Sequence, residues 1–278
     1  MYITDNRLIL KKNLDSLYDS YDFKNRLAYD PIEFLHKFSK ASDIEIAGFI
    51  ASAFAYGRID LFKPVIARIL SAMGKSPYDF IINFDLYKHR NVFSGIQYRF
   101  SKNDDITGFL FVLHKVIVNY GGLENLFKIK FNKDHPNTGK ALAGFVNTFN
   151  LIIHETSLRE SAGLRHFLPS PEKGSACKRL NLFLRWMIRD RDIDLGIWKG
   201  IPKNKLVIPL DTHIARISKC LMLTKRKSVD WATAVEITES LKIFEPEDPL
   251  KYDFALCHQG VAKLCNELRC GECTLISK

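Results

Sequence analysis

Two side chains in the C-terminal half of the sequence have the types and positions that an amine-dependent reaction needs. Lys178 lies in the first turn of a helical pattern that starts at Ser175, and Asp211 stands immediately before another helical pattern. A lysine beside a carboxylate in a partly dry cleft can serve as an amine nucleophile. The two residues share a cleft only if both helices point toward it. Otherwise they are exposed helix-start residues that never meet, because most surface lysines and N-cap aspartates do no chemistry.

The position of Lys178 indicates that its amine faces another group. The helix macrodipole favours anions at the N-terminus, so a lysine in the first turn costs about 0.3–1 kcal/mol. The preceding segment, 167–174, contains two prolines, a serine and a glycine, and predicts a tight link between two helices. Unpaired backbone N–H groups at such a link suit a phosphate oxygen.

The elements that must position these residues are helical almost throughout, so the sequence predicts an all-α fold. Ser42 and Glu45 match a capping box, and Ser175 is the expected N-cap of the helix that carries Lys178. The apolar segment 205–210 contains Pro209 and predicts an isolated extended segment. Helices are expected within 42–56, 61–73, 76–84, 104–120, 138–157, 175–190, 211–223, 231–244 and 248–265.

The chain of 278 residues carries a net charge of +10 and has a pI of about 9.2. This balance favours a polyanionic partner, usually nucleic acid, although a merely basic surface is the alternative. No window reaches the ~18 apolar residues of a membrane span. The first 20 residues lack the apolar core of a signal peptide, so we expect a cytoplasmic protein. The cations expected to form a DNA-facing surface are Lys178, Arg185, Arg189, Lys199, Lys203, Lys205, Lys225, Arg226 and Lys227.

Three segments together resemble the ordered core of the helix-hairpin-helix DNA glycosylases. They are "LPSPEKGSACKRLNLFLRWM" (168–187), "IPLDTHIARIS" (208–218) and "FALCHQGVAKLCNELRCGECTL" (254–275). The chain also closely resembles a bacterial family described only as being of unknown function. The interval of 33 positions from Lys178 to Asp211 is more similar to the archaeal 8-oxoguanine glycosylase branch than to the endonuclease III branch.

The resemblance implies a DNA glycosylase with AP-lyase activity. Asp211 matches the catalytic aspartate and Lys178 the Schiff-base lysine, while Lys173 is the runner-up when positions are counted from Leu168-Pro169. A damaged nucleotide, such as an oxidised purine, is flipped into a cleft between two helical domains. These domains are expected to be 42–192, with the hairpin, and 1–41 plus 193–278. The partner implied is damaged double-stranded DNA, with neither a membrane nor a small-molecule cofactor.

The resemblance also implies the residues that contact DNA. The hairpin contributes Lys173, Gly174 and Ser175, but Glu172 in the same turn opposes phosphate binding. Tyr56 and Arg58 lie where related enzymes fill the gap left by a flipped base, and a buried turn is the alternative. Further expected contacts are Thr212, His213 and Arg185, of which Thr212 caps or orients the helix and His213 is either structural or a phosphate ligand.

Cysteines gather at the C-terminus in the pattern Cys265-x4-Cys270-x2-Cys273. The iron–sulfur loop of the resembled enzymes has four cysteines, so a fourth ligand has to come from Cys257 or His258. A zinc site of three cysteines and one histidine is the alternative, as are free thiols. No cofactor is therefore predicted firmly.

Two other functions fit the same residues. A DNA-binding protein on the same scaffold would bind duplex DNA in a salt-dependent way without releasing a base. A helical module that binds protein or RNA would use the basic face alone and would not prefer DNA with a lesion or an abasic site.

Overall fold

A computed structural model of the protein describes residues 2–156 and 158–261. Within these ranges no β-strand occurs, and the β-type pairings are two isolated bridges, Tyr98 with Ser101 and Ser175 with Asp230. The prediction of an all-α fold is thus confirmed for the described residues. The segment after Lys205 is extended without a pairing partner, as Pro209 indicated.

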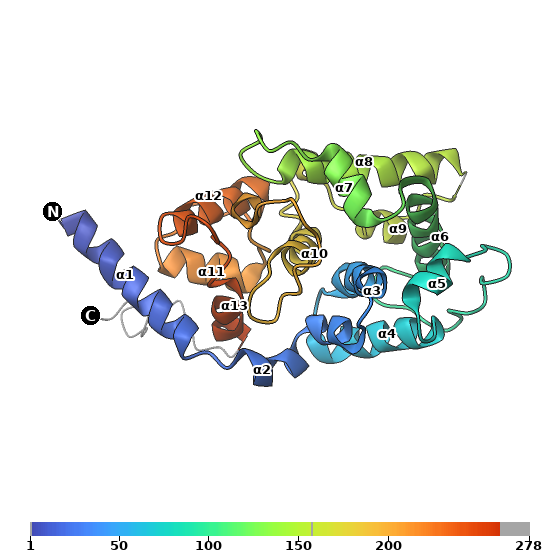
Figure 1. The fold of residues 1–278 in the computed structure, drawn as a ribbon, viewed down its shortest axis with the longest axis horizontal. Coiled ribbons are helices and arrows are strands. Elements are labelled where there is room, and N and C mark those ends of the chain that lie inside the picture. The colour runs from blue at the N-terminus through green and yellow to red at the C-terminus, as the bar shows by residue number, and fades with distance from the viewer. Residues whose placement is uncertain (1, 157, 262–278) are drawn as a thin grey trace.

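The helices are joined by connections of unequal length, of which 83–102 between α5 and α6 is among the longest (Figure 1). In chain order they are α1 (Tyr2–Asp19), α2 (Phe23–Arg26), η1 (Leu27–Tyr29), η2 (Pro31–Lys37), α3 (Ala41–Phe54), α4 (Ile59–Ala72), α5 (Pro77–Ile82), α6 (Asn103–Tyr120), α7 (Leu123–Lys130), α8 (Gly139–Glu155), α9 (Ala162–His166), η3 (Pro171–Lys173), α10 (Lys178–Ile188), η4 (Lys203–Lys205), α11 (Thr212–Cys220), α12 (Trp231–Lys242) and α13 (Asp253–Val261).

Helix α3 lies at the centre of the larger of two apolar clusters. Every residue from Asp43 to Phe54 is buried, and α3 packs against α10, η2, α4 and α5. Phe49 has ring contacts with phenylalanines of α6, α8 and α10. Trp186 and Trp198 are buried in the same cluster, as expected for Trp186. A helix that is apolar on nearly every face belongs in the interior, which explains the small residues along α3.

The smaller apolar cluster joins α11, α12 and α13 to Leu14 of α1 and to the extended segment 207–210. Figure 1 shows α11–α13 on one side of α10 and α3–α9 on the other. Side chains from 31–37 and 193–206 belong to the larger cluster, although the sequence assigned both segments to the second domain. The division into domains itself stays a prediction.

A buried ionic network fastens the C-terminal half of α10, and it corrects the predicted basic stripe. Arg185 and Arg189 are only 3% and 2% exposed. The sequence counted both among the cations of a DNA-facing surface, but both guanidinium groups point inward to carboxylates. The pairs are Arg185 with Asp194 and Asp253, and Arg189 with Asp192, Asp194 and Asp248.

Two predicted helix caps are wrong because Glu45 and Ser175 make contacts with distant segments of the chain instead. Glu45 is buried, and its carboxylate accepts hydrogen bonds from the backbone N–H groups of Leu123 and Glu124 and from Nε1 of Trp198. It therefore caps α7 rather than α3. Ser175 pairs with Asp230, and α10 begins three residues later with Cys177 as its N-cap.

No single helix in the described ranges is long and apolar enough to cross a membrane. Helices α6 and α7 meet the length and composition criterion only as a pair, which is bent by 70°. Most residues of α6 between Asp105 and Ile117 are buried among other helices.

Candidate functional site

The amine of Lys178 is held at the end of α3. Lys178 is the first residue of α10, and its Nζ donates a hydrogen bond to the carbonyl oxygen of Ala55 at 3.2 Å. The neighbouring Arg179 donates from Nη1 to the carbonyl of Ala53 at 2.6 Å. The last carbonyls of a helix lack intrahelical partners and carry partial negative charge. The C-terminus of α3 therefore attracts both cations and fixes where the lysine amine lies.

The two carboxylate oxygens of Asp211 have different partners: one caps helix α11, and the other faces Lys178. As the N-cap of α11, its Oδ1 accepts hydrogen bonds from the backbone N–H groups of His213 and Ile214, each at 3.0 Å. Its Oδ2 lies 4.0 Å from Nζ of Lys178. The side chains of Lys178 and Asp211 are 30% and 24% exposed, so the pair is partly dry but reachable.

The structure therefore brings together the two residues whose types suggested chemistry. They lie at the starts of α10 and α11, which converge as the sequence argument required. Lys173, the alternative lysine, is exposed on η3, and within the described ranges no ion pair involves it. Of these two lysines, Lys178 is the one that can exchange a proton with Asp211 after a small movement.

A cavity of about 410 Å³, here called the Lys178 cavity, opens beside this amine. The hairpin, α9 and the segment before α12 surround it, and Asp211 is not among the described residues that line it. In this conformation Lys178 lines the cavity and Asp211 does not. The lining residues are Arg165, His166, Pro169, Ser175, Ala176, Cys177, Lys178, Arg179 and Val229.

His166 is a member of the site that the sequence argument missed. Its ring packs edge-on against Tyr56 with the centroids 4.7 Å apart, and the guanidinium of Arg179 lies over that same Tyr56 ring, 5.0 Å from its centroid. Burial, together with Arg179 and Arg99, lowers the pKa of His166 to about 4. The imidazole is therefore neutral at neutral pH. A helix-end histidine in "LRHFLP" carries no signal that would separate it from a structural one.

Of the hairpin, Pro169 and Ser175 line the Lys178 cavity, whereas Glu172, Lys173 and Gly174 are not among its lining residues. Lys173 and Gly174 are exposed, and the carbonyl of Gly174 accepts a hydrogen bond from the backbone N–H of Trp231. The carboxylate of Glu172 accepts a hydrogen bond from Nδ2 of Asn147 in α8. This hydrogen bond holds the Glu172 carboxylate toward α8.

The other expected DNA contacts are distributed unevenly. Tyr56 is half-buried, while Arg58 is exposed and paired with Asp60 at 2.7 Å. Thr212 is exposed on the first turn of α11, and His213 packs against Gly260 of α13. Arg185 is withdrawn from the surface by its two carboxylate partners, so its predicted contact with DNA is wrong for this structure.

The predicted cysteine loop falls largely outside the described residues, since Cys265, Cys270 and Cys273 are not among them. Cys257 is half-buried in α13, and Nδ1 of the neighbouring His258 lies 2.7 Å from the hydroxyl of Tyr21. Among residues 2–156 and 158–261 no group of three histidine, cysteine or acidic side chains is arranged to hold a metal ion.

Comparison with known families gives one match, which covers most of the chain. The model of DUF2400, described as a protein of unknown function, matches residues 30–262. This range includes Lys178, Asp211 and every described residue that lines the Lys178 cavity. No curated protein and no solved structure matches the chain.

Proposed function

The chain belongs to the DUF2400 family, and we propose that it is a DNA glycosylase with AP-lyase activity. The distance of 4.0 Å between Nζ of Lys178 and Oδ2 of Asp211 carries the proposal. It joins an amine and a carboxylate that are 33 positions apart, beside a cavity and in a chain with a net charge of +10.

In the proposed reaction the damaged nucleotide leaves the duplex and enters the Lys178 cavity. Asp211 accepts a proton from Nζ, and the neutral amine forms a bond to the sugar carbon that carries the base. The bond from that carbon to the base breaks, and the base departs with the bonding electron pair and takes up a proton. Opening of the sugar ring gives an imine on Lys178, from which β-elimination cleaves the strand.

The hydrogen bond to Ala55 gives Lys178 a defined starting position for this attack. Positioning of a reacting group replaces part of the entropic cost of bringing two reactants together. Since Oδ1 of Asp211 is occupied by two backbone N–H groups, the carboxylate cannot rotate freely, and Oδ2 stays on the side of the lysine.

The surroundings of the cavity suit a phosphate backbone. Lys225, Arg226 and Lys227 are exposed on the segment before α12, and Val229 of the same segment lines the Lys178 cavity. Trp231 ties this segment to the hairpin at Gly174. Together with Arg165 and Lys178 in the cavity lining, these exposed cations favour binding of a polyanion that passes over the cavity.

The proposal includes a two-domain architecture with the reaction in a cleft. Lys178 begins a helix whose apolar side chains belong to the larger cluster, whereas Asp211 follows Leu210 of the smaller cluster. A strand of DNA that reaches both residues would therefore bind where the two clusters meet.

Strand cleavage at an abasic site tests the proposal. A labelled duplex with one abasic site is incubated with the wild-type chain, Lys178→Ala, Lys173→Ala and, as a distant control, Lys75→Ala. We expect cleavage by every protein except Lys178→Ala. Equal cleavage by Lys178→Ala refutes the role of Lys178. Salt-dependent DNA binding by all four proteins without any cleavage favours the DNA-binding protein without catalysis.

A further inference from the structure

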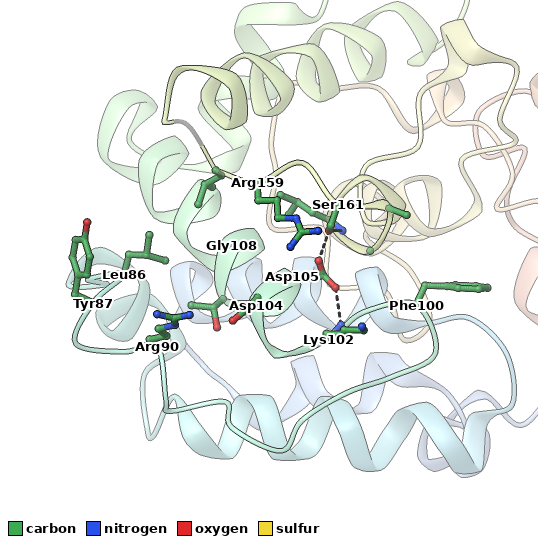
Figure 2. Close-up of a pocket in the computed structure, with 15 residues that line it drawn as sticks. Leu86, Tyr87, Arg90, Phe100, Lys102, Asp104, Asp105, Gly108, Arg159 and Ser161 are labelled. Atoms are coloured by element: carbon green, nitrogen blue, oxygen red, sulfur yellow. Dashed lines mark hydrogen bonds between the residues drawn. The ribbon is translucent and has the colours of Figure 1, made fainter.

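A second cavity, of about 500 Å³, lies beside the start of α6 (Figure 2). It is here called the Arg159 cavity, and its apolar wall includes Leu86, Leu158 and Leu164. Figure 2 shows Arg159 reaching in from one side and Arg90 and Lys102 on the opposite side. The cavity thus combines an apolar wall with three cationic side chains.

The charges of the Arg159 cavity favour an anion. Within the described residues Arg90, Lys102 and Arg159 take part in no ion pair with a carboxylate, and all three are exposed. Of the two acids at this cavity, Asp105 is buried, and its carboxylate accepts hydrogen bonds from the backbone N–H of Lys102 and from the hydroxyl of Ser161. Three unpaired cations therefore face one exposed acid, Asp104.

Phe100 connects the two cavities. Its side chain is 63% exposed and lines the Arg159 cavity, while its ring lies 5.3 Å from the ring of His166, which lines the Lys178 cavity. Figure 2 shows the Phe100 ring at one end of the Arg159 cavity, pointing away from Arg90. A polymer that leaves the Lys178 cavity along this surface passes over Phe100 and reaches the three cations.

The turn that presents Phe100 is held in place. The backbone groups of Tyr98 and Ser101 form two hydrogen bonds of 2.9 Å, and Arg99 between them has a positive φ of 51°. Gly163 of α9 lies so close that a Cβ there would stand 2.5 Å from the carbonyl oxygen of Phe100. Left-handed backbone at a non-glycine residue costs free energy and is concentrated at functional sites. An exposed phenylalanine on such a turn suits stacking on a base.

We propose that the Arg159 cavity holds the nucleotide next to the one at Lys178, with its base on Phe100 and its phosphate between Lys102 and Arg159. This inference rests on the proposed function, because it places the two cavities along one DNA strand. Stacking on an aromatic side chain tolerates any base, since every base has a flat face. The contact therefore adds affinity for distorted DNA without selecting a sequence.

The test is the affinity for a duplex that contains one tetrahydrofuran abasic-site analogue, measured by fluorescence anisotropy over a series of salt concentrations. We expect Phe100→Ala to bind about tenfold more weakly. Phe100→Trp should restore the affinity. Arg159→Ala should bind more weakly and make the slope of log K against log salt less negative by about 0.7–0.9.

Two control variants match these changes outside the cavity. Ile129→Ala removes an apolar side chain that is 65% exposed on α7, and Lys75→Ala removes one exposed positive charge after α4. If Phe100→Ala and Arg159→Ala bind like these controls, the inference is overturned. Cleavage of abasic DNA by the wild-type chain is measured separately. Weakened binding by both variants, without any cleavage by the wild-type chain, refutes the proposed function and leaves the nucleotide contact standing.

Discussion

Replacing Arg189 with methionine should destabilise the fold more than any surface change. The guanidinium is 2% exposed and lies 2.8 Å from Asp192, 2.9 Å from Asp194 and 3.0 Å from Asp248. Methionine fills much of the same volume but leaves Asp248 without its ion-pair partner, while Asp194 keeps Arg185 and Asp192 keeps the hydroxyl of Tyr18. Breaking a buried ion pair from one side costs about 3–5 kcal/mol. Because the free energy of unfolding of a domain is about 5–15 kcal/mol, this loss is a large fraction of the total stability.

Urea unfolding followed by circular dichroism measures this loss. A decrease of 3–5 kcal/mol moves the midpoint by about 1 M or more at an unchanged slope. Lys242→Met is the matched control, because Lys242 pairs with Glu239 at the surface at 3.1 Å, and such pairs contribute about 0–1 kcal/mol. The double variant Arg189→Met/Asp248→Leu should lose less than the sum of the two single variants, since one stranded carboxylate is gone. A loss for Arg189→Met as small as that for Lys242→Met would refute the reasoning.

Three further outcomes are expected. Asp211→Asn keeps a cap for α11, so its unfolding free energy should change by only a few tenths of a kcal/mol. The rate at which it cleaves abasic DNA should fall at least about 100-fold. An unchanged rate would exclude the carboxylate from the chemistry. His166 has a pKa near 4 when folded and near 6.5 when unfolded, so its contribution to stability is complete above pH 6.5 and is lost as the pH falls toward 4. Between pH 6.5 and pH 4, His166→Phe should therefore lose less unfolding free energy than the wild type does, as measured by urea titrations at several pH values. Gly57 has a φ of 81°, and a Cβ there would stand 2.7 Å from the Tyr98 hydroxyl. Gly57→Ala should therefore lower the free energy of unfolding by about 1–2 kcal/mol, which thermal unfolding detects as a lower midpoint temperature. A midpoint equal to that of the wild type would contradict this geometry.

The helical class and the approximate helix positions could be predicted because apolar periodicity is a local property of the sequence. The segments expected at 104–120 and 231–244 correspond to α6 and α12. Helices α1 and α7 were not predicted. Helix α7 has eight residues, and its start depends on Glu45, which lies 78 positions earlier in the chain.

The candidate site was predictable only in part, for a similar reason. Residue type and spacing selected Lys178 and Asp211, and the resemblance to glycosylases assigned their roles. The hydrogen bond of Lys178 to Ala55 and the packing of Phe100 on His166 join residues 123 and 66 positions apart, so no local pattern indicates them. Arg185 failed as a DNA contact because its carboxylate partners, Asp194 and Asp253, come from segments whose docking no periodicity specifies.

The central claim is that the amine of Lys178 becomes bonded to the sugar of a damaged nucleotide while Asp211 takes its proton. Borohydride reduction of the wild-type chain with abasic DNA, followed by mass spectrometry of the digested adduct, locates that bond. The account predicts the sugar remnant on the peptide that contains Lys178, and no adduct when Lys178 is alanine. A remnant on Lys173 or on any other amine, or no adduct with the wild-type chain, would contradict it.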